Sequence, residues 1–362
     1  MGNRNEPPRR RGPIPYAWRM MADDPALDKR ALADFLRREG LARGQLLDAS
    51  LLKGGRSNLT FDLIVDDNHW VLRRPPLGQS LATAHDVQRE FTVMSALSGT
   101  GIPVPRMVAY CSDQGVLGAP FYVMEHVNGD VLRTTEDVMQ LPPDRRGGLM
   151  YSLIDVLADL HTIDPQEIGL GAFGRPDGFM QRQVRRWTEQ LQATREYDVP
   201  GIDVLAAGLA ENVPHAAASA IIHGDYRLDN CVTRGGDIRA VLDWEMSTVG
   251  DPLADLATFV VYHDGLAERP NAVVEAPGRL PGVPNIGELL SRYEAKTARA
   301  IQHLDWYLAF AWFKLAVILD GVRYRSIHGR TSGGDFADVA ELINPAIEHG
   351  LVALAGRGLD VR

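Results

Sequence analysis

Hydrophobic and polar positions change their spacing along the first part of the chain. Residues 28–39 repeat apolar side chains at helical spacing, whereas residues 59–65 alternate apolar and polar side chains. Strict alternation predicts a half-buried strand, and the polar residues at 66–68 provide a turn into a second strand at 69–74. This region therefore predicts a helix followed by a β-hairpin.

The pattern downstream predicts two more strands and then a long helical region. Helical spacing returns at 84–98, and short apolar runs at 107–111 and 121–126 predict strands. Beyond residue 128 one strand-rich interruption lies at 221–243. The remaining elements are expected to be helices at 145–161, 178–196, 203–212, 252–263, 285–325 with at least one break, and 335–355.

The change from strands to helices predicts two lobes, and 362 residues are enough for two cores. We expect a flexible tail at 1–25, a smaller strand-rich lobe at 26–127 and a larger helical lobe at 128–362. The tail is rich in Pro, Gly and Arg. It has no apolar segment that would make it a secretory signal, and an organelle transit sequence is the alternative to a plain tail.

Composition and charge narrow the class of protein. Lys and Arg number 38 against 47 Asp and Glu, which gives a net charge of −9 and argues against nucleic-acid binding. The most apolar stretch, 307–319, contains Lys314 and is shorter than the roughly 18 residues that cross a bilayer, so we expect a buried helix and no membrane span. Two cysteines cannot form a disulfide framework and favour a cytoplasmic protein.

The strongest chemical signal is the segment 221–230, which reads IIHGDYRLDN. An apolar run leads into a polar loop that carries Asp225 and Asn230, and a later strand ends at Asp243. Carboxylate and amide oxygens are ligands that suit Mg²⁺, and a nearby carboxylate can accept a hydroxyl proton. These are the parts that phosphoryl transfer needs, because positioning and metal electrostatics dominate that reaction.

The same residues carry a family resemblance. The motif H-G-D-x-x-x-x-N at 223–230, followed by D-W-E at 243–245, resembles the aminoglycoside phosphotransferase superfamily, whose relatives are the protein kinases. The amino-acid sequence of this motif is most similar to that of the kinase-like domains fused to acyl-CoA dehydrogenases. The resemblance implies that Asp225 is the catalytic base and that Asn230 and Asp243 hold Mg²⁺.

The resemblance extends over roughly residues 45–330 and implies a fold and cofactors. The expected fold is α+β and bilobal, like a protein kinase, with a five-stranded antiparallel sheet in the small lobe. ATP, or GTP as the alternative, is expected between the lobes together with Mg²⁺. The implied activity is transfer of the γ-phosphate to the hydroxyl of a small-molecule acceptor.

A glycine-containing turn precedes the predicted hairpin and contains Gly54, Gly55, Arg56, Ser57 and Asn58. Glycine lets backbone N–H groups approach phosphates closely, and the last two residues add side-chain donors. An ordinary hairpin turn has the same composition, but the family has a similar loop, so the resemblance implies nucleotide binding. No G-K-[ST] sequence is present, which excludes a Walker loop.

Glu90 is expected on the inward face of its helix with Val87, Phe91 and Met94. A buried carboxylate needs a partner, and the hairpin offers Arg73 where protein kinases have a lysine that contacts the phosphates. The resemblance implies that Glu90 fixes this arginine against the nucleotide. A solvent-facing pair is the alternative, and arginine differs from lysine in its phosphate geometry.

The strand at 121–126 ends where the resemblance implies the hinge between the lobes. Backbone groups of Glu125 and Val127 would then bind the adenine edge, and Met124 would close the back of the pocket. The residues themselves indicate only a strand followed by a turn.

Four polar residues have a structural interpretation that we favour over a catalytic one. His223 is expected to pack beneath the loop and bind a backbone carbonyl. Asp251 is expected to cap a helix whose first turn contains a proline, and Asp255 to brace the catalytic loop. His161 ends an apolar helix face and is expected to be structural.

The acceptor is expected to contact residues 263–330. This window has nine Lys and Arg against seven Asp and Glu, and six aromatic residues lie between 306 and 324. A polycationic aminoglycoside would favour a pocket rich in carboxylates, so we expect an apolar or anionic acceptor such as a hydroxyacyl compound or a hydroxy acid. The alternatives are an aminoglycoside phosphotransferase, a catalytically weak nucleotide-binding module and a metal-dependent hydrolase.

Overall fold

The computed structural model describes residues 27–44, 46–52, 58–77, 87–215, 218–265, 277–328 and 339–358. The predicted tail at 1–25 lies outside these ranges, as do Gly54, Gly55, Arg56 and Ser57. The chain divides into two compact units, and each is treated by itself below. The first comprises Met1–Gln88 and Met107–His126, and the second comprises Arg89–Arg106 and Val127–Arg362.

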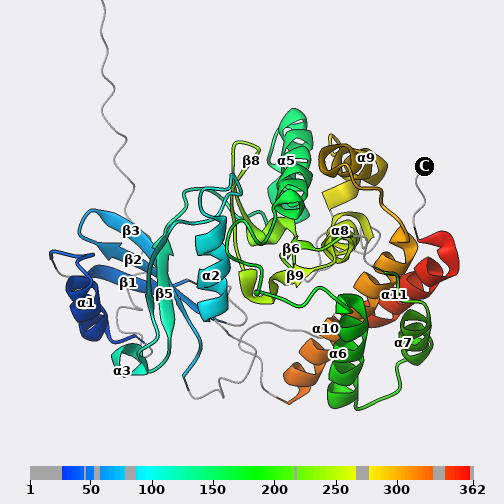
Figure 1. Ribbon diagram of the computed structural model, residues 1–362, viewed down its shortest axis with the longest axis horizontal. Helices are drawn as coiled ribbons and strands as arrows, with labels where there is room; N and C mark the ends of the chain where they lie inside the picture. Colours follow the sequence, from blue (N-terminus) through cyan, green and yellow to red (C-terminus); the bar gives the residue numbers. More distant parts are fainter. Residues whose placement is uncertain are drawn as a thin grey trace, which may run out of the picture. The chain divides into compact units, whose positions relative to one another are not determined.

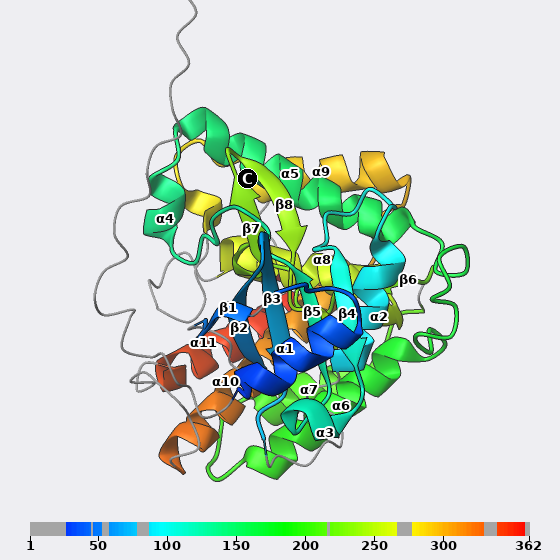
Figure 2. The same cartoon turned by 90° about the vertical axis from the view of Figure 1, so that its left-hand side faces the viewer.

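The first unit contains a five-stranded antiparallel sheet (Figure 1), and its strand order is β1-β2-β3-β5-β4 (Figure 2). Phe61 pairs with Leu72 and Leu63 pairs with Trp70, so the central hairpin has the register that the alternating pattern requires. Every pair of neighbouring strands is antiparallel, which confirms the predicted fold class. The strands are β1 (Leu46–Leu51), β2 (Leu59–Val65), β3 (Asn68–Arg74), β4 (Met107–Cys111) and β5 (Phe121–Glu125).

Helix α1 (Lys29–Arg38) covers one face of this sheet, as Figure 2 shows. Asp28 caps the helix by accepting hydrogen bonds from the backbone N–H groups of residues 30 and 31. The apolar side chains Leu32, Phe35 and Leu36 are buried in one core with β2, β3 and β5. The ring of Phe35 meets Phe121 edge to face, with centroids 5.1 Å apart. Burial of this apolar face stabilises the sheet. The short helix α3 (Gln114–Leu117) also contacts α1.

The second unit is mainly helical and is built around α10 (Leu304–Ile327), which packs against α6, α8 and α11. Two small antiparallel sheets pair β6 with β9 and β7 with β8. The strands are β6 (Ala220–Ile222), β7 (Cys231–Arg234), β8 (Asp237–Val241) and β9 (Thr248–Gly250). The other helices are α2 (Val87–Leu97), α4 (Thr135–Met139), α5 (Pro143–Thr162), α6 (Phe179–Thr194), α7 (Ile202–Glu211), α8 (Pro252–Val260), α9 (Ile286–Thr297) and α11 (Val339–Val352).

One residue explains why most of α2 groups with the second unit. The guanidinium of Arg89 donates to the carbonyls of Phe173 (2.6 Å) and Ser247 (3.0 Å), and it lies over the Phe173 ring at 3.9 Å. Both partners are outside the helix and within the second unit. These bonds hold α2 to the loops that precede α6 and β9.

Most predicted elements are confirmed, and two differ in ways that have a local cause. The break that was predicted within 285–325 is confirmed between α9 and α10, where Ala298 and His303 take positive φ values of 52° and 54°. Strand β1 was not predicted at its position, because its sequence LLDASL does not alternate. The helix predicted at 252–263 is α-helical only to Val260, and a π-helical segment follows at Val261–Gly265. Within the described ranges, no helix is both long and apolar enough for a membrane crossing.

Candidate active site

The loop between β6 and β7 brings Asp225 and Asn230 into direct contact. The side-chain nitrogen of Asn230 donates to the backbone carbonyl of Asp225 (2.9 Å) and to its carboxylate (3.0 Å). A 3₁₀ turn at Leu228–Asn230 closes the loop and brings the side chain of Asn230 within hydrogen-bond distance of Asp225. Because the amide nitrogen faces Asp225, the amide oxygen of Asn230 points away from it.

His223 connects this loop to the segment that contains Asp243. Its Nε2 lies 2.8 Å from the carbonyl of Leu242, and its Nδ1 lies 3.2 Å from the backbone N–H of Asp225. A carbonyl can only accept and a backbone N–H can only donate, so Nε2 carries the proton and Nδ1 is the acceptor. Both ring nitrogens of this fully buried imidazole are used within the protein, which suits positioning and not proton exchange with a substrate.

Asp255 on α8 fixes the start of the same loop. Its two oxygens accept the backbone N–H groups of His223 (2.5 Å) and Gly224 (2.8 Å). Behind it, Nε2 of His161 lies 3.5 Å from the carboxylate, and Nδ1 of His161 contacts the hydroxyl of Tyr293 at 2.7 Å. Burial alone would raise the pKa of Asp255, but the His161 contact and the backbone donors hold it below the ordinary value.

Asp251 lies at the N-terminus of α8. One oxygen accepts the N–H of Leu253 at 3.0 Å, and the other accepts the hydroxyl of Tyr307 at 2.5 Å. Burial raises the pKa of Asp251, and the two hydrogen bonds oppose this shift only in part. These contacts place the carboxylate in a helix cap and in the core of the second unit.

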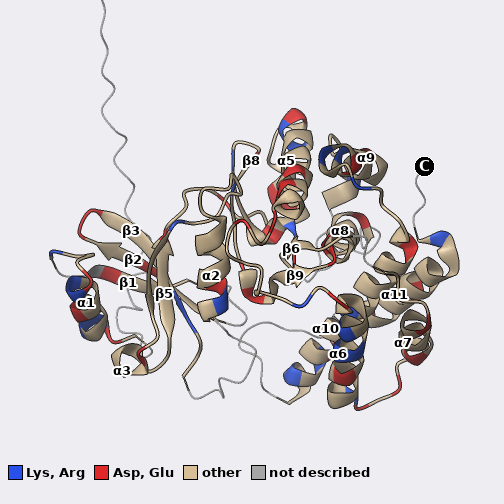
Figure 3. Cartoon of the chain, in the orientation of Figure 1, with Lys and Arg blue, Asp and Glu red and all other residues tan. Residues whose placement is uncertain are grey.

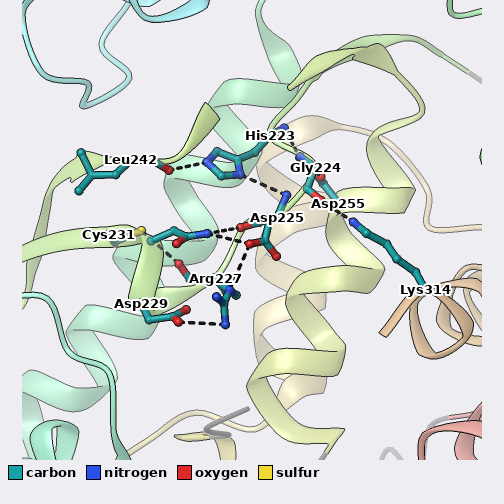
Figure 4. A network of polar contacts seen from close by, with 10 residues as sticks. His223, Gly224, Asp225, Arg227, Asp229, Cys231, Leu242, Asp255 and Lys314 are labelled. Atoms are coloured by element: carbon teal, nitrogen blue, oxygen red, sulfur yellow. Dashed lines mark hydrogen bonds and ion pairs between the residues drawn. The ribbon is translucent and has the colours of Figure 1, made fainter. Parts of the chain in front are cut away.

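Asp225 is ionised by the charges around it (Figure 4). Burial would raise its pKa, but the Arg227 guanidinium and the Lys314 ammonium hold it below the ordinary aspartate value. The Nε of Arg227 lies 3.3 Å from the carboxylate, and its Nη1 lies 2.9 Å from Asp229. About a quarter of the Asp225 side chain remains exposed, 24% by area, so a ligand can reach it.

Asp243 adopts a strained backbone conformation at the point where β8 leads into a 3₁₀ turn. Its φ and ψ are 66° and 54°, the left-handed region that costs a non-glycine residue about 1 kcal/mol or more. The preceding residue, Leu242, accepts the bond from His223 and donates its N–H to the carbonyl of Asn230 at 2.8 Å. The segments that carry Asn230 and Asp243 are therefore adjacent.

The residues predicted to bind nucleotide are divided between the two units. In the first unit, Asn58 is buried directly before β2, and Arg73 lies on β3 opposite Tyr122. Met124 is buried on β5 and Glu125 pairs with Trp70.

The second unit holds the other two described residues of this group. Glu90 on α2 is fully buried, which rules out the solvent-facing alternative, and Val127 begins the segment that follows β5. The four remaining members of the predicted nucleotide loop lie outside the described residues.

Two residues that the motif analysis did not assign contribute to the site. Arg227 lies inside the motif, at a position that the family pattern leaves open. Lys314 comes from the middle of α10, and its ammonium donates to the carbonyl of Gly224 at 2.5 Å. The signal for Lys314 was present, since a single lysine in a long apolar run needs a buried partner.

A second cluster, in the first unit, contains Asp62, His69 and His126, whose ligand atoms lie within 4.8 Å of one another. The two imidazole rings stack face to face, with centroids 3.7 Å apart and planes inclined by 6°. An imidazole binds a metal in the plane of its ring, so one ion cannot be bound by both rings in this arrangement. His69 instead contacts Asp62 at 2.6 Å.

Comparison with known proteins identifies the family of the chain. A family model described as phosphotransferase enzyme family (APH) matches residues 48–288. Human acyl-CoA dehydrogenase family member 11 is 36% identical over 335 residues, which cover 90% of this chain and 43% of the human protein. The chicken protein of the same name is 39% identical over 82% of this chain and 39% of its own length. The chain thus spans less than half the length of these relatives.

Solved structures give the same result. A Ralstonia eutropha protein, provisionally named an aminoglycoside phosphotransferase, has a TM-score of 0.79 and 34% identity over 91% of this chain and 98% of its own. Aminoglycoside phosphotransferase APH(4)-Ia, solved with AMP-PNP and hygromycin B, shares the fold at a TM-score of 0.59 and 15% identity, with 90% and 99% of the two chains covered. Since the family match covers more than half of its residues, this chain belongs to the APH family of phosphotransferase enzymes.

Proposed function

We propose that this phosphotransferase moves the γ-phosphoryl group of ATP to a hydroxyl group of a small metabolite. The observation that carries the proposal is the contact between an ionised Asp225 and Asn230 in one loop. In the reaction, the hydroxyl oxygen forms a bond to the γ-phosphorus and the bond from that phosphorus to the bridging oxygen breaks. ADP leaves, and the hydroxyl proton passes to the Asp225 carboxylate.

The low pKa of Asp225 defines its part in this reaction. A carboxylate with a depressed pKa is a weak base, so it does not remove the proton from a free hydroxyl. It accepts a hydrogen bond that orients the hydroxyl and takes the proton late, as a loose transition state permits. Arg227 and Lys314 keep the carboxylate ionised and ready to accept that bond.

Asn230 and Asp243 are the residues we propose for Mg²⁺. The amide oxygen of Asn230 points away from Asp225, and Asp243 contributes a carboxylate from the adjacent segment. Hard oxygen ligands of this kind fit magnesium. When bound, magnesium offsets the charge on the phosphate oxygens.

The nucleotide is proposed to contact the loop from Gly54 to Asn58, the guanidinium of Arg73 and the backbone at 124–127. Glu90 is proposed as the partner of this arginine, because a buried carboxylate is costly without a partner. Support for ATP also comes from the fold neighbour that was solved with AMP-PNP.

For the acceptor we propose a molecule with an anionic or apolar part, such as a hydroxy acid or a hydroxyacyl thioester. Arg227 and Lys314 both lie beside Asp225, and Arg186 on α6 adds its charge to the surroundings of Lys314. Figure 3 shows several basic residues along α6. The relatives named as acyl-CoA dehydrogenase family members favour an acyl compound.

Five of the six aromatic residues of α10 do not enter this argument. Trp306, Tyr307, Phe310, Trp312 and Phe313 are all buried, at 7% exposure or less. They form core contacts within the second unit. The proposal for the acceptor therefore depends on the cations beside Asp225.

An aminoglycoside is the second candidate acceptor, and it is favoured by the names of the structural neighbours. The two cations beside Asp225 argue against it, because Arg227 and Lys314, which hold this carboxylate ionised, also repel a polycation. The two candidates differ in the sign of the acceptor charge, which makes them easy to separate.

The test is Mg²⁺-dependent transfer from [γ-³²P]ATP with a panel of hydroxy acids, their coenzyme A thioesters, kanamycin and hygromycin B. We expect labelled product with an anionic acceptor and none with the two aminoglycosides. Label on the aminoglycosides alone would overturn the acceptor assignment. ATP-induced stabilisation without transfer to any compound would indicate a binding module, and metal-dependent hydrolysis without nucleotide would indicate a hydrolase.

A further inference from the structure

Lys314 is a charged residue in an unusual place. It lies near the middle of α10 at 8% exposure, and its neighbours Phe313 and Leu315 are exposed by 0% and 3%. Removing an ammonium group from water costs several kcal/mol unless the protein replaces the lost interactions. A residue kept here against that cost needs specific partners, and the structure supplies them.

The ammonium of Lys314 contacts the loop that carries Asp225 (Figure 4). It donates to the carbonyl of Gly224 at 2.5 Å and lies 5.6 Å from the centre of the Trp187 ring. Burial lowers the pKa of Lys314, while Asp225 and Asp255 oppose that shift by favouring the charged form. The charge is thus matched by carboxylates on both sides of Gly224.

The bond acts on the peptide unit that joins Gly224 to Asp225. This unit is planar, and its oxygen and nitrogen are held by different side chains, one from α10 and one from the loop itself. The oxygen accepts from Lys314 on α10, and the nitrogen donates to Nδ1 of His223 at 3.2 Å. Two contacts on opposite edges of a plane fix its rotation, and this rotation sets the direction in which the Asp225 side chain leaves the backbone.

The backbone at Gly224 has little freedom to relax in another way. Its φ is +87°, and a Cβ atom built there would lie 2.6 Å from the carbonyl oxygen of Met246. Its N–H is held by Asp255 at 2.8 Å. Gly224 is therefore in close contact with Met246 and hydrogen-bonded to Asp255. Lys314 binds the carbonyl oxygen, which is the polar atom of this peptide unit that faces α10.

We propose that Lys314 is a positioning residue for Asp225, which it orients through the carbonyl of Gly224. The inference depends on the proposed function in which Asp225 receives the acceptor hydroxyl. It adds a requirement that the family motif does not contain, because the lysine comes from a helix 90 residues later in the chain. Its removal is expected to slow transfer while leaving nucleotide binding intact.

The variants are Lys314→Met, which keeps the apolar stem, and Lys314→Arg, which keeps a charged donor. Lys296→Met is the matched control, since Lys296 on α9 is 33% exposed and pairs with Asp159 at 2.9 Å and with Asp155 at 3.9 Å. The measurements are kcat and KM for the acceptor found in the panel above, the Kd of AMP-PNP and the melting temperature.

For Lys314→Met we expect kcat to fall about 10- to 100-fold, as misplacement of a reacting group by about 1 Å does. The Kd of AMP-PNP should stay within about twofold. The melting temperature should fall, because the substitution leaves the buried carbonyl of Gly224 and the carboxylates of Asp225 and Asp255 without their cationic partner. Lys314→Arg should recover part of kcat. An unchanged kcat in Lys314→Met would overturn the proposal, and so would a loss that follows the melting temperature and is equal in both variants.

A crystal structure of Lys314→Met separates failure of this inference from failure of the proposed function. If the wild-type protein transfers phosphate to no compound of the panel, the proposed function has failed, but the structural effect can still be measured. We expect the Asp225 carboxylate to lose its contact with Asn230 or to occupy more than one position. An Asp225 that keeps its wild-type position would contradict the inference.

Discussion

His223 and Leu242 are joined by a 2.8 Å hydrogen bond from the imidazole to the main-chain carbonyl, across 19 residues of sequence. The same ring accepts the N–H of Asp225. The buried side chain of His223 is thus hydrogen-bonded both to the backbone of Asp225, the proposed base, and to the segment that ends at Asp243. We propose that the histidine of the motif serves as this bridge and takes no part in proton transfer.

Replacing His223 with Phe should therefore damage both stability and turnover. The substitution leaves the carbonyl of Leu242 and the N–H of Asp225 without their partner, at a cost of about 1–3 kcal/mol for each buried group. We expect a lower free energy of unfolding in urea and a kcat reduced about 100-fold. His215→Phe, at an exposed position, should change neither; equal effects of the two substitutions would refute the bridge.

Asp255→Asn tests the support beneath the loop. The amide can accept only one of the two N–H bonds that the carboxylate receives from His223 and Gly224, so its nitrogen faces a donor. The expected loss in the free energy of unfolding at pH 7 is about 2–3 kcal/mol. Asp203→Asn is the control, because that side chain is 71% exposed.

The pH dependence of this difference has a defined sign. The pKa of Asp255 is lower in the folded protein than in the unfolded chain. Its stabilising effect is therefore complete above the unfolded value of about 4 and is lost as the pH falls through the folded value. The difference in the free energy of unfolding between wild type and Asp255→Asn should become smaller only in that acid range. A difference that becomes smaller near pH 7 would disprove the lowered pKa of Asp255.

His263 gives a separate acid effect, which has the same sign as that of Asp255 but begins at a higher pH. Burial beside Phe259 lowers the pKa of His263 to about 4, although Asp264 opposes the shift. The unfolded chain binds a proton near pH 6.5 and the folded protein does not, so stability should fall between pH 6.5 and pH 4. The total effect is about 3 kcal/mol for one group at this burial.

His263→Leu removes this proton and should flatten the change of unfolding free energy over the same pH range. Urea unfolding at pH 7, 6 and 5 measures the slope, and His215→Leu, at an exposed position, should retain the wild-type slope. A His263→Leu protein that loses stability with acid as steeply as the wild type would show that another group is responsible.

How far the sequence could predict this protein depends on the range of each interaction. The hairpin was predicted because Phe61, Leu63 and Val65 alternate with polar residues, and alternation is a local property. Strand β1 has no such pattern, since its place depends on pairing with β2. The close approach of Asp225 to Asn230 was expected from their spacing in one loop. In the structure the side-chain nitrogen of Asn230 lies 3.0 Å from the carboxylate of Asp225.

The part that could not be predicted is the support from distant helices. Asp255 was expected to brace the loop, but the sequence does not say that it would receive two adjacent N–H groups. Lys314 was expected only as an interruption of a buried helix. Its contact with Gly224 depends on how α10 packs in the second unit, which no local pattern encodes.

The most direct test of the account is Asp225→Asn, measured by phosphate transfer from [γ-³²P]ATP and by AMP-PNP binding. Asparagine keeps the shape and length of the side chain, but it cannot accept the proton of the acceptor hydroxyl. The account predicts that kcat falls by about 10²–10⁴ while the Kd of AMP-PNP changes by less than about threefold. A variant that transfers phosphate at close to the wild-type rate would contradict the central role of Asp225.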